Sequence, residues 1–154
     1  MKNFKFTEKI VIRSDQETVF DYTQDYSRRL VWDTFLRRAE LIDGAKAPAA
    51  GVVAYCVSKH GMGMYTEYVT FNRPNVTAIR MTKGPKMFRD FLGSWNFRPA
   101  GEGLTEVTFL YSFDIRFPFS LFSGLIRAIL KNNVRQRLKD LKVAVENLQQ
   151  DGTG

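Results

Sequence analysis

The sequence has 154 residues, of which 44% are hydrophobic and 25% charged, which fits one globular domain with its own core and excludes a disordered chain. Its formal net charge of +7 would suit an anionic partner, although a basic excess of this size is more often a solvated surface. With no apolar stretch long enough to span a membrane, a lone Cys and no secretion signal, we expect a cytoplasmic protein.

The N-terminal residues predict one strand followed by two short helices. Apolar and polar side chains alternate over residues 4–13, which is the period of a half-buried strand. Ser14 and Glu17 then form an S-x-x-E capping box, which predicts that a helix begins here. A second short helix is predicted around residues 27–35, with Ser27 as its N-cap.

The middle of the chain predicts an antiparallel meander. Turn sequences such as KHGMG, NRPN and AGEG separate runs rich in Val, Tyr, Phe and Thr up to about residue 116. The clearest run is residues 106–116, where one face carries only apolar side chains, namely Val107, Phe109, Tyr111, Phe113 and Ile115.

After Pro118, apolar residues recur at a spacing of three and four, which predicts one long amphipathic helix. The expected fold is therefore α+β. A curved antiparallel sheet of about seven strands wraps around a long C-terminal helix, with two short helices between the first two strands. We expect residues 1–150 to form a single domain and residues 151–154 a tail. A strongly bent sheet cannot touch a straight helix along its whole length, so a cavity is expected between them.

The chemistry of most enzyme classes is missing from the sequence. With one His and one Cys, no zinc site of nitrogen and sulfur ligands can form. Cys56 is predicted to be a small buried thiol and His60 an exposed turn residue. No phosphate-binding loop or nucleophile elbow occurs. We expect no metal and no cofactor, and no catalytic residue can be assigned.

The stretch GPKMFRDFLGSWNFRP, residues 84–99, is rich in rings in a chain that already has 13 Phe. These rings could fill an ordinary core or line a cavity. If Trp95 and Phe97 point inward, strand parity turns Phe91 and Arg89 the same way.

The strand YTEYVTF, residues 65–71, allows two interpretations of its inward face. The set Tyr65, Glu67, Val69 and Phe71 buries more apolar surface than the set Thr66, Tyr68 and Thr70, which favours an inward Glu67. An inward carboxylate would need a partner such as Arg89 or Arg80. Alternatively, Glu67 lies at a strand end and reaches solvent.

The order of elements, with VFDYTQDYSRRLVWD after the first strand, resembles the helix-grip proteins of the START-like, polyketide cyclase/dehydrase superfamily (SRPBCC). The pattern G-P-x-x-F followed by G-x-W-x-F-x-P is similar to the branch that contains coenzyme Q-binding proteins and ribosome-association toxins. The resemblance implies a deep apolar cavity between sheet and C-terminal helix for lipids, quinones, polyketides or other hydrophobic molecules.

The candidate ligand-binding residues are the rings of the inward face, two polar anchors and an entrance near the start of the long helix. They are Glu67, Arg89, Phe91, Trp95, Phe97, Phe109, Tyr111, Trp32, Leu125 and Ile129.

Three functions fit these observations. The first is a non-catalytic binder or carrier of a hydrophobic small molecule. The second is an aromatase/cyclase that folds a polyketide chain, with Glu67, Arg89 and Tyr111 moving protons. The third is contact of the basic residues with a ribosome, RNA or a membrane surface. No specific DNA binding is expected, and the sequence leaves the ligand and the oligomeric state open.

Overall fold

The computed structural model describes residues 4–151. Seven strands, three α-helices and one 3-10 helix follow one another along these residues. Their bounds are β1 (Phe4–Ile12), α1 (Gln16–Gln24), α2 (Arg29–Trp32), β2 (Leu36–Leu41), β3 (Val53–Ser58), β4 (Gly63–Asn72), β5 (Val76–Lys83), β6 (Phe88–Gly101), β7 (Leu104–Ile115), η1 (Phe119–Phe122) and α3 (Ser123–Asp151).

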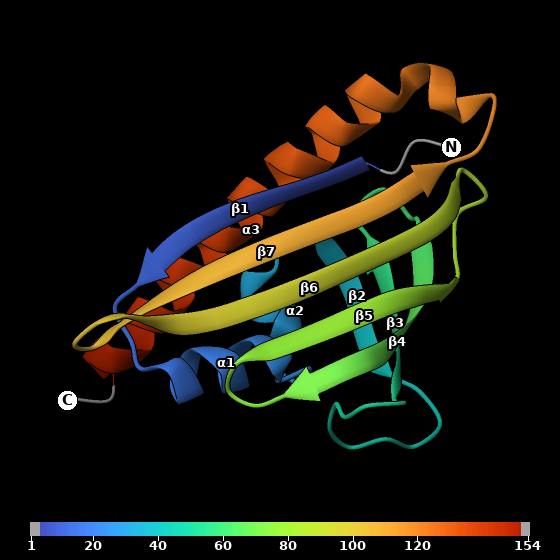
Figure 1. Cartoon of the computed structure of the whole chain (residues 1–154). Helices are drawn as coiled ribbons and strands as arrows, with labels where there is room; N and C mark the ends of the chain where they lie inside the picture. The colour runs from blue at the N-terminus through green and yellow to red at the C-terminus, as the bar shows by residue number, and fades with distance from the viewer. Residues whose placement is uncertain (1–3, 152–154) are drawn as a thin grey trace.

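The strands form one antiparallel sheet in the order β1-β7-β6-β5-β4-β3-β2. Figure 1 shows the sheet curling around the side on which α1, α2 and α3 lie. Register shifts interrupt the pairing of β2 with β3, of β4 with β5 and of β6 with β7, and such bulges bend a sheet. This architecture confirms the expected helix-grip fold. The tail expected at residues 151–154 lies, beyond Asp151, outside the described residues.

The contact between α3 and the sheet changes along the helix. In the second half of α3, Val134, Leu138, Leu141 and Val145 are all buried in the hydrophobic core. Near its start, Ile129 is 50% exposed, and Ile126 and Leu130 are only half-buried. The helix therefore closes one end of the curled sheet and stands away from it at the other.

The start of α1 differs from the expected capping box. Asp15 is the N-cap, and its carboxylate accepts hydrogen bonds from the Thr18 backbone N–H at 3.1 Å and the Thr18 hydroxyl at 2.6 Å. The bond from the Thr18 side chain is the main reason that the pKa of Asp15 lies below its usual value. Ser14 is buried instead, and its hydroxyl has no hydrogen-bond partner among the described residues.

Ser27 was also expected to cap a helix, and here too a neighbour takes the role. The N-cap of α2 is Arg28, while the Ser27 backbone N–H and hydroxyl both donate to the Asp25 carboxylate. An acidic side chain two residues earlier thus holds the turn in which a serine cap was expected.

These caps give a matched pair of substitutions. We expect Asp15→Ala to lower the free energy of unfolding by about 1 kcal/mol, because it removes a capping acceptor at the start of α1. Ser14→Ala should cost clearly less, because it removes a buried hydroxyl that makes no hydrogen bond within the described residues. Urea denaturation of both variants measures the difference. A larger loss for Ser14→Ala would restore the capping box as the correct interpretation.

Candidate functional site

A cavity of about 320 Å³ lies between the first half of α3 and the inner face of the sheet. Strands β3 to β7 contribute to its walls, and Ile126, Ile129 and Leu130 of α3 cover it. Its lining includes the exposed side chains His60, Met62 and Ile129, which mark its mouth between the β3–β4 turn and α3. The expected space between the bent sheet and the helix is therefore present.

Aromatic rings form the floor of the cavity. Trp95 and Phe109 meet edge to face at 4.4 Å between ring centroids, Phe109 and Tyr111 at 4.6 Å, and Phe91 lies 4.7 Å from Tyr111. Aromatic pairs in these geometries stabilise the fold beyond the contribution of the area they bury. The rings therefore hold one another in place and form the cavity floor without a ligand. The two interpretations of the aromatic stretch are thus both partly right, because the rings pack on one another and also face a cavity.

Gly93 makes room for this floor. It lies opposite Tyr111 in the pairing of β6 with β7. A Cβ at this position would lie 3.0 Å from the Tyr111 ring and 3.4 Å from the Ile79 side chain, so a larger residue would displace the ring. The glycine of the G-x-W motif therefore sets the position of Tyr111 at the cavity.

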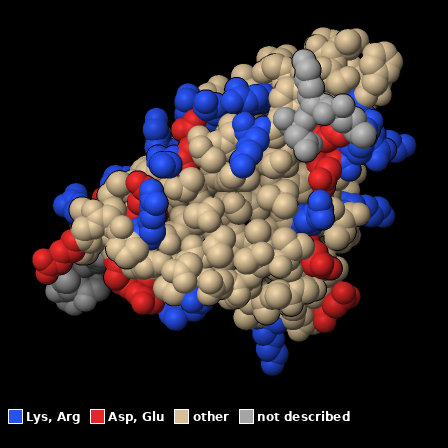
Figure 2. Space-filling view, viewed as in Figure 1, with Lys and Arg blue, Asp and Glu red and all other residues tan. Residues whose placement is uncertain are grey.

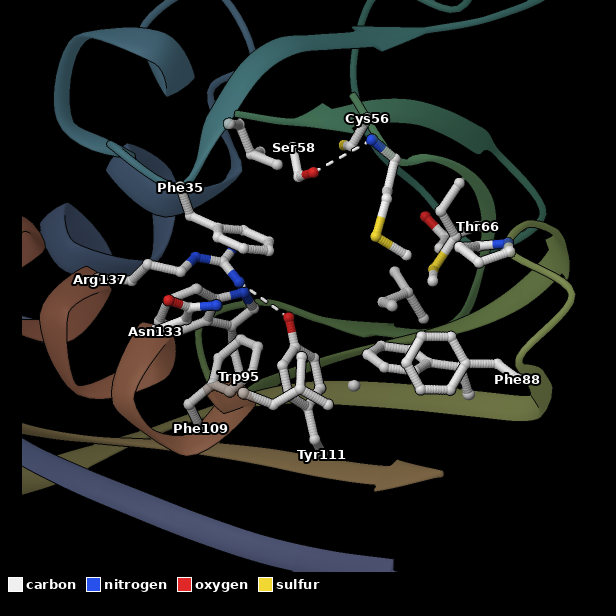
Figure 3. Close-up of a pocket in the computed structure, with 18 of the residues that line it drawn as sticks. Phe35, Cys56, Ser58, Thr66, Phe88, Trp95, Phe109, Tyr111, Asn133 and Arg137 are labelled. Atoms are coloured by element: carbon white, nitrogen blue, oxygen red, sulfur yellow. Dashed lines mark hydrogen bonds between the residues drawn. The ribbon is translucent and has the colours of Figure 1, made fainter. Parts of the chain in front are cut away.

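Charged side chains form one end of the cavity. Arg29 at the start of α2, Asp33 at its C-cap and Arg137 of α3 make a buried cluster, called here the Arg–Asp–Arg cluster. Asp33 Oδ2 accepts from Arg29 Nε at 2.8 Å and from Arg137 Nη2 at 2.9 Å. Arg137 Nη1 also donates to the Tyr111 hydroxyl at 2.8 Å, as the close-up in Figure 3 shows. Asn133 lies beside Arg137, one helical turn earlier.

The cluster is ionised and carries a net positive charge. Burial by itself would raise the pKa of Asp33, but the guanidinium groups of Arg137 and Arg29 outweigh it and hold this pKa below its usual value. Burial opposes the charge of both arginines, and Asp33 more than offsets it, so their pKa values are raised. Two cations therefore share one anion in a site that is almost closed to solvent.

Neutral polar groups line the cavity beside this cluster, where the Arg29 guanidinium lies 5.9 Å from the Tyr26 ring centroid. The Tyr26 and Tyr68 hydroxyls are 2.7 Å apart, and Tyr68 donates to Gln24 Oε1 at 2.9 Å. Burial raises the pKa of both tyrosines and of the Cys56 thiol, so all three stay protonated at neutral pH. The raised pKa makes Cys56 a slow nucleophile, although its side chain is only half-buried.

Half of the candidate ligand-binding residues face the cavity directly. Phe91, Trp95, Phe109, Tyr111 and Ile129 all line it.

Three other candidates lie just outside the lining. Phe97 and Trp32 are buried behind the wall, where Phe97 stacks on Trp95 and the ring of Trp32 meets that of Trp95 edge to face at 6.2 Å. Leu125 is exposed on the outer side of α3 near the mouth.

Glu67 does not point inward as expected. Thr66 and Tyr68 are the inward residues of this part of β4 and line the cavity. Glu67 was expected to point inward because strict alternation places it on the same face as Phe71, and Phe71 does pack against the core. A register shift between Tyr68 and Thr70 inserts Val69, so that Tyr68 and Phe71 face the same side although they are three residues apart.

Arg89 is likewise turned outward, which corrects the orientation inferred from strand parity. The pairing of β6 with β7 shifts between Phe88 and Asp90, so Phe88 and Phe91 both face the cavity while Arg89 does not. The Arg89 side chain is 44% exposed and lies 3.7 Å from the carboxylate of Asp114. Glu67 of β4 and Arg89 of β6, the two expected polar anchors, are therefore not among the described residues that line the cavity.

The Arg–Asp–Arg cluster was missed because its members come from distant segments. A weak signal existed for Arg137, which lies three residues after buried Val134 and four before buried Leu141, and so on the apolar face of α3. Arg29 and Asp33 are four residues apart, the spacing of an ion pair on a helix. Neither signal shows that the two segments meet.

No three His, Cys, Asp or Glu side chains within residues 4–151 are grouped so that they could hold a metal ion. No helix in that range is long and apolar enough to cross a bilayer.

A curled seven-stranded sheet, a long C-terminal helix and an apolar cavity between them define the helix-grip class of proteins. The chain belongs to the family described as "Polyketide cyclase / dehydrase and lipid transport", whose profile matches residues 3–146. Among curated proteins, none matches the sequence significantly.

Solved structures share this fold at low sequence identity. A START superfamily protein from Mycobacterium smegmatis has a TM-score of 0.80 at 11% identity, with 94% of this chain and 98% of that chain covered. The Zhui aromatase/cyclase from Streptomyces sp. R1128 has a TM-score of 0.78 at 12% identity, with 94% of each chain covered. TTHA0849 from Thermus thermophilus also has a TM-score of 0.78, at 19% identity, with 92% and 96% covered. At such identities these similarities establish the fold alone.

Proposed function

We propose that the protein binds and carries a hydrophobic small molecule, of a lipid, quinone or polyketide-like class, in the cavity under α3. The observation that carries this proposal is the cavity itself, a space of about 320 Å³ with aromatic walls and polar groups confined to a few positions. This is the composition of a typical small-molecule site. The family description, which includes lipid transport, supports it.

The protonation states in the cavity favour binding over catalysis. Burial raises the pKa of the Cys56 thiol and of the Tyr26 and Tyr68 hydroxyls and keeps them neutral, and Asp33 is an anion held by two arginines. A general base needs a pKa near the working pH, and none of these groups meets that condition.

A cavity-filling variant tests the proposal. The probe is Nile red, a neutral apolar dye whose fluorescence rises in apolar sites. We expect the native protein to bind it and Thr66→Phe, which puts a ring into the cavity, to weaken binding about tenfold or more, since overpacking costs about 1–3 kcal/mol. Thr70→Phe is the control, because Thr70 is exposed on the same strand.

Cys56 supplies a second readout that is independent of the dye's fluorescence. It is the only cysteine and lines the cavity, so a bound ligand should slow its alkylation by iodoacetamide. Failure of the native protein to bind Nile red, together with unchanged alkylation at saturating dye, would refute the carrier function.

An aromatase/cyclase activity is the second candidate, and one contact favours it. The Tyr111 hydroxyl faces the cavity and accepts a hydrogen bond from Arg137, which suits it to donate its own proton to a substrate carbonyl. If this is the function, Tyr111→Phe should abolish cyclisation of a polyketide mimic while Nile red binding persists. If Tyr111→Phe cyclised the mimic as fast as the native protein, Tyr111 would have no such catalytic role.

A further inference from the structure

The charge of the Arg–Asp–Arg cluster is not balanced by the protein. Arg29, Asp33 and Arg137 are 6%, 0% and 5% exposed, so solvent screens them little. Arginine keeps its charge in proteins, so two positive charges face one negative charge. A buried charge is costly unless it is paired. Among the described residues, the Arg137 guanidinium has hydrogen bonds only to the carboxylate that it shares with Arg29 and to the neutral Tyr111 hydroxyl.

The neutral surroundings compensate this charge only in part. The guanidinium of Arg137 lies 5.2 Å from the Phe35 ring centroid and 5.4 Å from that of Phe109, and Arg29 lies 5.1 Å from Trp32. Ring faces attract cations, but they do not neutralise them. These contacts place the surplus charge beside the cavity without cancelling it.

Both arginines of the cluster keep N–H groups that can donate hydrogen bonds to a ligand. A guanidinium has five N–H groups. Within the described residues, Arg29 donates through Nε to Asp33 and through Nη1 to the Thr23 carbonyl. Arg137 donates through Nε and Nη2 to Asp33 and through Nη1 to Tyr111, which uses three of its five N–H groups. Both arginines line the cavity, and so does Asn133. A planar carboxylate is the anion that matches a guanidinium in two-point hydrogen bonding.

From this arrangement we infer that the natural ligand is a hydrophobic carboxylic acid whose single negative charge completes the cluster. Its carboxylate lies at Arg137 and Arg29, beside Asn133. Its apolar part extends along α3 toward Leu130, Ile129 and Ile126, about 17 Å away at the rise of a helix. The acid therefore binds with its head in the interior and its tail toward the mouth.

This inference rests on the proposed carrier function, and its test separates the two. Laurate and dodecan-1-ol have the same alkyl chain length and differ in charge, and each is titrated as a competitor of Nile red. We expect the native protein to prefer laurate about tenfold or more, because only the acid adds a charge-assisted hydrogen bond in a buried site. Arg137→Met should remove this preference, which is measured as the ratio of the two competitors' affinities within each variant and so does not depend on how tightly that variant binds Nile red.

The matched control is Arg135→Met, the same change on the same helix. Arg135 is exposed and pairs with Glu8, so the variant lowers the net charge equally and leaves the cavity intact. It should keep the preference for laurate. Arg29→Met provides a second probe of the cluster if Arg137→Met folds poorly.

Each negative result shows whether the acid inference or the carrier function is wrong. Nile red binding with equal or tighter binding of the alcohol would overturn the acid inference and leave the carrier function intact. Loss of the preference in Arg135→Met would show that overall charge, and not the cluster, attracts the acid. No binding of Nile red by the native protein would remove the carrier function as well.

An independent surface feature lies beside the mouth of the cavity. Five large apolar side chains at and before the start of α3, called here the apolar tip, are between 45% and 76% exposed. They are Phe117, Phe119, Leu121, Phe122 and Leu125. Figure 2 shows this end of the molecule, at the upper right, as an area without charged side chains. Exposed apolar groups gathered in this way mark an interaction surface.

The charged residues of the chain segment that carries the apolar tip are all basic, although Glu8 of β1 lies 3.7 Å from Lys131. Between Asp114 and Lys139 the sequence has five Lys or Arg residues and no Asp or Glu. Of these, Arg116 is exposed, and Arg127 and Lys131 lie on the first turns of α3. A cluster of exposed Phe and Leu flanked by basic residues suits an anionic lipid surface, where apolar groups enter the interface and cations meet head groups.

The geometry points to the apolar tip as a docking site for an anionic membrane surface. Ile129 both lines the cavity and is exposed next to the tip, so docking brings the mouth against lipid. A hydrophobic ligand could then pass between membrane and cavity without crossing water. This surface needs no assumption about the ligand.

Vesicle co-sedimentation tests the docking. We expect binding to vesicles of phosphatidylglycerol and phosphatidylcholine, weaker binding to phosphatidylcholine alone, and a loss of about tenfold or more in the double variant Phe117→Ser/Leu121→Ser. Val31→Ser is the control, because Val31 is 77% exposed on α2, away from the tip. Full binding by the double variant, no binding by the native protein, or RNA binding that the same variant removes would each overturn it.

Discussion

Asp33→Asn should lower the free energy of unfolding by about 3–5 kcal/mol, the usual cost of removing one partner from a buried ion pair. Asp33 is fully buried and accepts from both Arg29 and Arg137. Asparagine has nearly the same shape but no charge, so the variant leaves two adjacent guanidinium groups without an anion. Urea denaturation at neutral pH measures the loss.

The matched substitution in the same cluster has a different expected result. Arg137→Met should cost less than half as much as Asp33→Asn, because it leaves Arg29 and Asp33 as a neutral pair and replaces the second cation by an apolar side chain of similar length. Equal losses would mean that both arginines are needed to balance the site and would contradict a surplus positive charge.

The pH dependence of this difference follows from the direction of the Asp33 shift. Its pKa in the folded protein lies below the ordinary value of 3.8, so the unfolded chain binds the proton more readily. The stabilisation by Asp33 is therefore complete above the unfolded pKa and is lost as the pH falls through the folded pKa. The gap between native protein and Asp33→Asn should be constant near neutral pH and shrink below about pH 4.

The fold was predictable because it depends on local patterns. Alternating residues such as Phe109 and Tyr111 identify the inner face of a strand, and the three-four spacing of Leu138, Leu141 and Val145 identifies the buried face of a helix. Each pattern is complete within about a dozen residues, and the order of the elements then leaves little choice of architecture.

The polar part of the site was not predictable, for two physical reasons. A bulge adds one residue to a strand, and this is enough to turn Glu67 and Arg89 to the opposite face from the one that parity assigns. The Arg–Asp–Arg cluster joins residues 104 positions apart, Asp33 and Arg137, and no local spacing reports such a contact. The apolar walls follow from sequence periodicity, whereas the anchors follow from tertiary structure.

The cavity leads us to expect unequal stability losses along α3 even when no ligand is bound. Leu141→Ala should lower the free energy of unfolding by about 2–5 kcal/mol, because Leu141 is fully buried where α3 packs tightly on the sheet. Leu130→Ala, three turns earlier on the same helix, should cost about 1 kcal/mol or less, because Leu130 is half-buried and already borders empty space.

The pair is matched, because both changes replace leucine by alanine within α3 and helix propensity affects them equally. Thermal or urea unfolding of the ligand-free protein gives the comparison. Since a methyl group that faces an open cavity has few partner atoms to lose, the difference between the two losses reports how far α3 stands from the sheet at each position. Similar losses would mean that the helix packs against a filled interior along its whole length, and the binding site would then have no room for a guest.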